Sequence, residues 1–236
     1  MFENCLATFK LQLKISMKNK IVFLYSLIIP VVLMFVNQRS DYKNMNIVYS
    51  FWAYIVVTTI LNGFMMNVIS LRENGFLKTL SYMIGSKESI VISLFLEQLL
   101  LIEIQILLFN VILSLFIKPL APIVFLYGFL VTGLATLLGT SMLSVLFLLK
   151  IKLQTFNTIT SIFFLVGIVL LNINPSGIWG YISTAINPFQ LVTEIYLIPY
   201  SLSALAWGSL GLSFGYLIMG FFILKNISIK SQLSRV

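Results

Sequence analysis

The chain has 236 residues, of which 59% are apolar and only 9% are charged. So little charge cannot solvate a globular surface, which excludes a soluble domain and indicates that lipid surrounds most of the chain. There is no histidine, which excludes Ser-His-Asp triads, histidine metal sites and histidine acid–base chemistry. We therefore expect an all-α polytopic membrane protein that forms one domain over residues 1–236, with no catalytic or metal site.

The leader, residues 2–20, carries two rows of side chains at helical spacing. They are the apolar row Phe2, Leu6, Phe9 and Leu13 and the basic row Lys10, Lys14 and Lys18. The pattern predicts an amphipathic helix lying in the inner membrane interface, with its lysines toward anionic headgroups. The alternative is an ordinary solvated basic leader.

Six apolar runs follow, near or above the roughly 17 to 25 residues that a helix needs to cross a bilayer. The predicted spans are residues 21–36, 47–71, 89–117, 121–149, 156–171 and 203–224. The first and the fifth are the shortest, so we expect them to take a turn from their flanks or to tilt.

The positions of the basic residues predict the orientation of these spans. With both termini in the cytoplasm, twelve of the fifteen lysines and arginines are cytoplasmic, and Arg39, Lys43 and Lys118 lie outside. The net charge of +8 then reflects membrane orientation, and we expect lipid contacts but no nucleic-acid partner.

The third span holds several polar side chains within one apolar run. They are Glu97, Gln98, Glu103, Gln105 and Asn110. A helical wheel places Glu103 and Asn110 on one face, and Gln98 and Gln105 on another. Polar groups at membrane depth are costly unless they face protein or water, so this helix should lie inside the bundle or line a path. These residues either form interhelical hydrogen bonds or line that path.

Small residues predict close helix packing in two later spans. In the fourth span they recur every four positions, at Gly128, Thr132, Thr136, Thr140 and Ser144. The sixth span carries a second group, Gly208, Gly211 and Gly215.

Residues 173–202 form a predicted outer segment without lysine or arginine. Asn174-Pro175 and Asn187-Pro188 each combine a helix N-cap with a proline at the first helical position. We expect two short apolar helices here, re-entrant or lying on the bundle.

The most polar internal segment, residues 72–88, lies between the second and third spans. It contains no phosphate-binding loop, because Gly85-Ser86-Lys87 lacks the upstream glycine spacing. Its beginning, Leu71-Arg72-Glu73-Asn74-Gly75-Phe76-Leu77-Lys78-Thr79-Leu80, resembles the R-E-x-G-x-[LF]-x-x-L signature of permease subunits of type-2 ABC exporters. Those permeases also have an amphipathic N-terminal elbow helix, six spans and an outer Asn-Pro segment, so the resemblance covers essentially the whole chain.

The resemblance implies a membrane subunit in a bacterial cytoplasmic membrane, paired with a second permease chain as a homodimer or heterodimer. Two separate ATP-binding subunits would bind ATP and Mg and hydrolyse the ATP, so this chain would be neither an enzyme nor a cofactor carrier. A coupling helix would contact them through apolar anchors Phe76, Leu77 and Leu80, with the remaining motif residues Arg72, Glu73, Gly75 and Lys78 around these anchors. The outer gate would comprise Asn187, Pro188 and Phe189.

The expected cargo is amphipathic or apolar, with hydrophobic peptides such as bacteriocins or peptide toxins ahead of drugs. Two other functions fit the same sequence. One is an immunity or sensor protein that binds a peptide in the membrane without transport. The other is an ion-coupled carrier that uses Glu97 and Glu103. The segment 72–88 could equally be a structured loop without a partner.

Overall fold

The computed structural model describes residues 2–16, 20–36, 45–117, 119–149, 152–171, 177–198 and 204–228. Within these ranges the structure is helical and contains no strand, which confirms the all-α class. The α-helices are α1 (Phe2–Ser16), α2 (Lys20–Val36), α3 (Met45–Thr59), α4 (Met66–Glu73), α5 (Phe76–Ile84), α6 (Lys87–Phe116), α7 (Pro122–Leu143), α8 (Leu153–Leu171), α9 (Ile178–Ile186), α10 (Pro188–Leu197) and α11 (Ala204–Lys225). A π-helical segment, η1 (Ile60–Met65), joins α3 to α4, and a 3₁₀ helix, η2 (Ser144–Leu148), follows α7.

Four helical segments are long and apolar enough to cross a membrane. They are Met45–Glu73, Lys87–Phe116, Pro122–Leu148 and Trp207–Lys225. They fall on the second, third, fourth and sixth predicted spans. The first and fifth predicted spans fall on shorter apolar helices, Phe23–Val36 and Leu153–Gly167. The described part of the chain therefore contains four membrane-length helices where the sequence predicted six.

The most enclosed helix is α3, which contacts α2, α6, α7, α8 and α10. Its side chains from Trp52 to Val57 are completely buried. A helix that is apolar on all sides is stable only when neighbours surround it, as they do here. The third predicted span, α6, does not occupy this central position. It exposes an apolar row to the outside, made of Ile92, Leu96, Leu100, Ile104 and Leu107.

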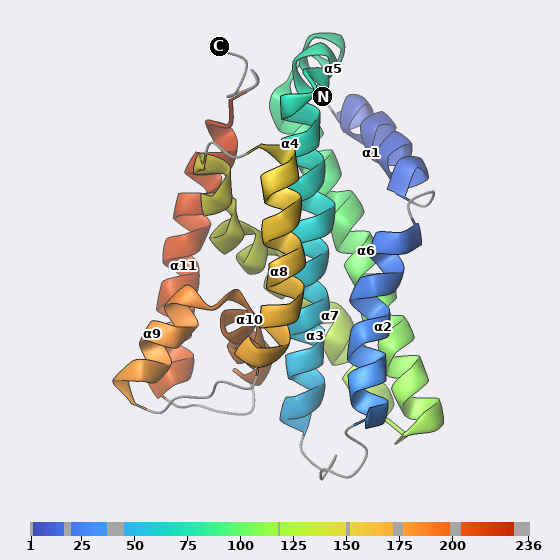
Figure 1. The fold of residues 1–236 in the computed structure, drawn as a ribbon, viewed down its shortest axis with the longest axis vertical. Helices are drawn as coiled ribbons and strands as arrows, with labels where there is room; N and C mark the ends of the chain where they lie inside the picture. Colours follow the sequence, from blue (N-terminus) through green and yellow to red (C-terminus); the bar gives the residue numbers. More distant parts are fainter. Residues whose placement is uncertain are drawn as a thin grey trace.

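The two ends of the bundle differ in charge. Helix α1, helix α5 and the end of α11 lie at one end, called here the α5 end, whereas α9 lies at the other (Figure 1). Within the described residues, each lysine and arginine lies on α1, on α5, or at or beside a helix end that faces the α5 end (Figure 1). They are Lys10, Lys14, Lys20, Arg72, Lys78, Lys87, Lys152 and Lys225.

Helix α1 forms as predicted, but its buried face differs from the expected apolar row. Leu6 is 42% exposed, whereas Thr8 and Gln12 are buried. The cause is the neighbouring helix, because the first turns of α6 present polar groups to α1. The hydroxyl of Ser93 donates a hydrogen bond to the carbonyl of Cys5. A polar face on α1 therefore packs against a polar face on α6.

The row of small residues on α7 and at the start of η2 packs as predicted. Gly128, Thr132, Thr136, Thr140 and Ser144 are all buried. Gly128 lies against the Trp52 ring, and Gly139 lies against Ile60 and Val192. These small side chains let α7 approach α3 and α10 closely.

The glycines of α11 behave differently from the prediction. Gly208 lies against the Tyr181 ring, but a Cβ added to Gly211 or Gly215 would meet nothing within 4 Å. Helix α11 approaches α7 closely at Gly220, where an added Cβ would lie 2.7 Å from the Cα of Ser141. Gly220, which the sequence pattern did not single out, is therefore the glycine that this packing requires.

The predicted helix pair between α8 and α11 is present as α9 and α10. Asn187 caps α10, accepting a hydrogen bond from the backbone N–H of Phe189 at 3.0 Å, and Pro188 occupies the first turn. Asn174 and Pro175 lie outside the described residues. Helix α10 is not superficial, because it packs on α3, α7 and α11. Its Phe189 and Tyr196 are fully buried, whereas Trp179 on α9 is 71% exposed.

Candidate functional site

The motif-bearing segment folds as a short helix between two membrane-length helices. Helix α4 ends at Glu73, and Gly75 adopts the left-handed conformation with a φ of 75°. Gly85 ends α5 in the same way with a φ of 83°, and the Ser86 hydroxyl caps α6 by accepting from the N–H of Ser89. Glycine adopts positive φ at little cost, which explains why one stands at each end of α5.

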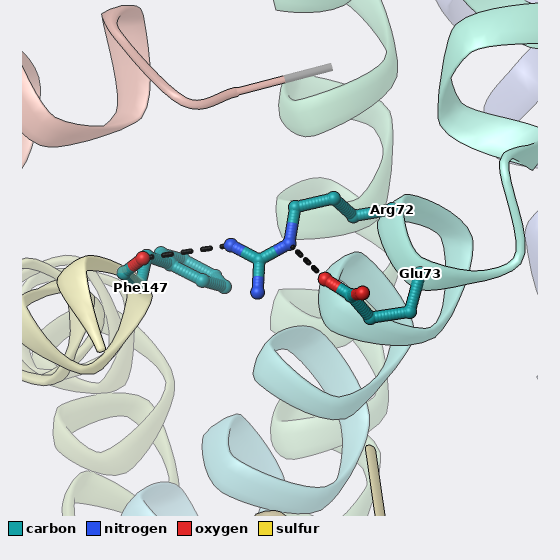
Figure 2. A network of polar contacts seen from close by, with 3 residues as sticks. All are labelled: Arg72, Glu73 and Phe147. Atoms are coloured by element: carbon teal, nitrogen blue, oxygen red, sulfur yellow. Dashed lines mark hydrogen bonds and ion pairs between the residues drawn. The ribbon is translucent and has the colours of Figure 1, made fainter. Parts of the chain in front are cut away.

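Arg72 connects the end of α4 to the end of η2 (Figure 2). Its Nε donates to Oε1 of Glu73 at 2.9 Å, and its Nη1 donates to the backbone carbonyl of Phe147 at 3.5 Å. The last carbonyls of a helix lack partners within that helix, and a cation placed there is favourable. Arg72 is only 1% exposed. It is therefore an internal link between two helices, which corrects the expectation that it borders a partner's groove.

Helix α5 exposes a different set of apolar side chains from the one predicted. Leu77 is fully buried by this chain, and Leu80 is half-buried, so Leu77 cannot serve as an anchor in this structure. Phe76 is 60% exposed, and Tyr82 and Met83 are each 78% exposed. These three side chains are called the α5 surface below.

Two polar residues of α6 bind neighbouring helices. Oε1 of Gln105 accepts a hydrogen bond from the Thr59 hydroxyl, and Nε2 of Gln105 donates to the hydroxyl of Ser26 and to the carbonyl of Phe23. Oδ1 of Asn110 accepts from Nε1 of Trp52 at 2.8 Å. These bonds join α2, α3 and α6. For Gln105 and Asn110, interhelical hydrogen bonding accounts for the polar side chain.

Glu97 and Gln98 are not satisfied in the same way. Nε2 of Gln98 donates to Oε2 of Glu97 at 2.7 Å, and both residues are buried. Oε1 of each residue is buried without a hydrogen-bond partner among the described residues. A buried acceptor without a donor costs about 1 to 3 kcal/mol. Glu103 is half-buried and lies within electrostatic range of Tyr196.

A cavity of about 540 Å³ lies beside Gln98, between α1, α2, η1, α4 and α6. Its polar lining consists of Ser16, Thr59, Asn62, Asn67, Gln98 and Gln105. Gln98 and Gln105, which the wheel placed on one face of α6, both line this cavity. Asn62 and Asn67 also line the cavity but were not among the predicted path residues, although two asparagines within one predicted span indicate a polar lining.

The predicted outer-gate residues hold α8 and α10 together. Nδ2 of Asn187 donates to the carbonyl of Leu170 at 3.1 Å. The Phe189 ring stacks near the rings of Tyr54 and Phe163, with centroid separations of 5.9 and 6.1 Å.

Comparison of the chain with protein-family models, with curated proteins and with solved structures finds no match.

Proposed function

We propose that this chain is the membrane subunit of an ATP-driven exporter similar to the type-2 ABC class. It would act with a second permease chain and with two ATP-binding subunits that carry ATP and Mg. The α5 surface is the observation that supports this proposal most. Exposed apolar side chains on a short helix are suited to a groove on a soluble partner.

The connections of α5 suggest how a partner's movement would reach the bundle. Through short turns, α5 continues into α4 on one side and α6 on the other, and both belong to membrane-length segments. The Arg72 link attaches the same region to η2, at the end of α7. A displacement of α5 would therefore be transmitted to three of the four membrane-length segments.

The proposal includes six membrane crossings, with α2 and α8 as the two short ones, and both termini in the cytoplasm. The basic residues gathered at the α5 end support this orientation, because cytoplasmic segments are enriched in lysine and arginine. The position of α1 and of the end of α11 at that same end supports an even number of crossings.

Cysteine labelling should show this topology. In a Cys5→Ser background, a membrane-impermeant maleimide added to intact cells should label cysteines at positions 44 and 176 but not at position 81. Permeabilised cells should be labelled at all three, which controls for reactivity. Labelling of position 81 in intact cells would contradict the orientation.

Removing the apolar side chains of the α5 surface should weaken binding of the ATP-binding subunit. Burying a large apolar side chain is worth roughly 1.5 to 3 kcal/mol, so Phe76→Ser with Met83→Ser should weaken association at least about tenfold. Membrane insertion and monomer stability should not change, since both side chains are exposed.

Co-purification with the ATP-binding subunit of a neighbouring gene, followed by an ATPase assay in lipid, would measure this effect. Thr79→Ser is the matched control, because Thr79 is exposed on the same helix but belongs neither to the α5 surface nor to the predicted coupling residues. Unchanged association of the double variant would remove the main support for an exporter. The alternatives of an immunity or sensor protein, or of an ion-coupled carrier, require no such surface and would then be favoured.

A further inference from the structure

We propose that the ATP-binding subunit receives α5 in an apolar groove that is bordered by carboxylates. This inference rests on the proposed function and adds the chemistry of the partner. Two observations carry it. The α5 surface is held beyond the depth of the membrane, and the exposed charges described around it are predominantly basic.

Helix α5 is held outside the hydrocarbon of the membrane by the length of its neighbours. Met45–Glu73 has 29 residues and Lys87–Phe116 has 30, so each is roughly 44 Å long, against a hydrocarbon core of about 30 Å. The far end of α6 fits the hydrocarbon, because Leu115 and Phe116 are 73% and 67% exposed. The surplus of roughly 15 Å therefore lies at the α5 end, where the α5 surface faces water or protein.

The exposed lysines described near α5 come from three different helices. Lys78 lies on α5, Lys152 directly precedes α8, and Lys225 ends α11. These elements lie together, because α8 packs on α4. In addition, Nζ of Lys87 donates to the carbonyl of Ile227, just after α11, at 3.4 Å. Three exposed ammonium groups therefore accompany the α5 surface at its end of the bundle (Figure 1).

Acidic groups do not balance these lysines. Glu73 is bound to Arg72 at 2.9 Å, which leaves Glu88 as the exposed acid among the described side chains of this end. Glu3, in the first turn of α1, is the other acid there. The neighbouring residues outside the described ranges add no acid but four basic residues, Lys18, Lys150, Lys230 and Arg235. Opposite charges across an interface speed association and exclude wrong partners, so a partner suited to this end carries carboxylates.

Anionic lipid headgroups are the other acidic surface at a cytoplasmic membrane face. The lysines of α1 are better placed for them than Lys78. Cys5 of α1 lies at Ser93 of α6, and Phe23, shortly after α1, lies at Gln105, so α1 descends along α6 away from α5. An exposed apolar surface beyond the hydrocarbon is suited to a protein groove, which favours a protein as the occupant.

Binding of the ATP-binding subunit of a neighbouring gene to the chain in phosphatidylcholine nanodiscs would test the charge. At about 50 mM salt, Lys78→Glu should raise Kd at least about tenfold, mainly through slower association. At about 500 mM salt the difference should shrink to less than about threefold, because salt screens exposed charges. Lys14→Glu is the matched control, since it reverses an exposed lysine in the last turn of α1. It should change Kd by less than about threefold at either salt concentration.

The outcomes separate this inference from the proposed function. Reversing one carboxylate of the partner's groove to lysine should restore binding of Lys78→Glu. Loss of binding in Phe76→Ser with Met83→Ser, but not in Lys78→Glu, would overturn the acidic border and leave the exporter proposal standing. Absence of binding by the unaltered chain would overturn both.

A lipid arm tests the competing occupant without any partner. The protein would carry Cys5→Ser and Met83→Cys, because Met83 is 78% exposed on α5. Maleimide labelling should be equally fast in nanodiscs of phosphatidylcholine and in nanodiscs that also contain phosphatidylglycerol. Protection by phosphatidylglycerol that Lys78→Glu abolishes would show that the α5 end binds the membrane, and would overturn the proposal.

Discussion

Arg72→Leu should lower the free energy of unfolding by roughly 3 to 5 kcal/mol, the loss expected when one partner of a buried ion pair is removed. The change leaves the Glu73 carboxylate, whose side chain is 9% exposed, without its cation. It also leaves the carbonyl of Phe147 without the guanidinium donor. Denaturant unfolding in detergent, followed by circular dichroism, would measure the loss.

Two further variants separate charge from geometry in this link. Arg72→Lys keeps the charge but cannot donate along two fixed directions, so it should recover only part of the stability. Lys78→Leu removes an exposed cation six residues away and should change the free energy of unfolding by less than about 0.5 kcal/mol. Wild-type stability in Arg72→Leu would show that the link does not hold α4 to η2.

Gly220→Ala should destabilise the protein by about 1 to 3 kcal/mol, because the added methyl group meets the backbone Cα and the Cβ of Ser141 on α7. The Cα and Cβ of Ser141 both lie 2.7 Å from the position of that methyl carbon. Backbone cannot rotate away as a flexible side chain can, so α11 and α7 must separate.

Gly215→Ala provides a matched control for this prediction on the same helix. Its added methyl group meets nothing within 4 Å, so it changes helix propensity without changing the packing. We expect the thermal unfolding midpoint to fall for Gly220→Ala and to stay the same or rise for Gly215→Ala. Equal midpoints for the two variants would contradict the close packing of α11 against α7 at Gly220.

Features that depend on neighbouring residues in the chain could be predicted from the sequence. The cap formed by Asn187 and Pro188 requires only local backbone geometry, and the structure confirms it. The row of small residues on α7 predicts close helix packing whichever helix packs against it. The limits of the short α5 helix are likewise local, because Gly75 and Gly85 adopt positive φ at its two ends.

Features that depend on which helix packs where could not be predicted. The buried face of α1 is polar because α6 presents Ser93 to it, and nothing within residues 2–20 reveals that neighbour. Leu77 and Phe76 are adjacent apolar residues, and only the position of the bundle decides that Leu77 is inside. Two residues of the π-helical segment, Asn62 and Gly63, line the cavity, and this segment has no recognised sequence signature here.

That π-helical turn also sets the rotational register of the long segment that contains it. The N–H of Met66 bonds to the carbonyl of Leu61, five residues back instead of four. One additional residue in a turn rotates everything after it by about 100° relative to an uninterrupted α-helix. Deleting a residue within Ile60–Met65 would convert the turn to ordinary α-helix and leave Arg72 pointing toward Phe147. The same deletion in α3 would swing Arg72 away from Phe147, so η1 is where this segment can tolerate a change in length.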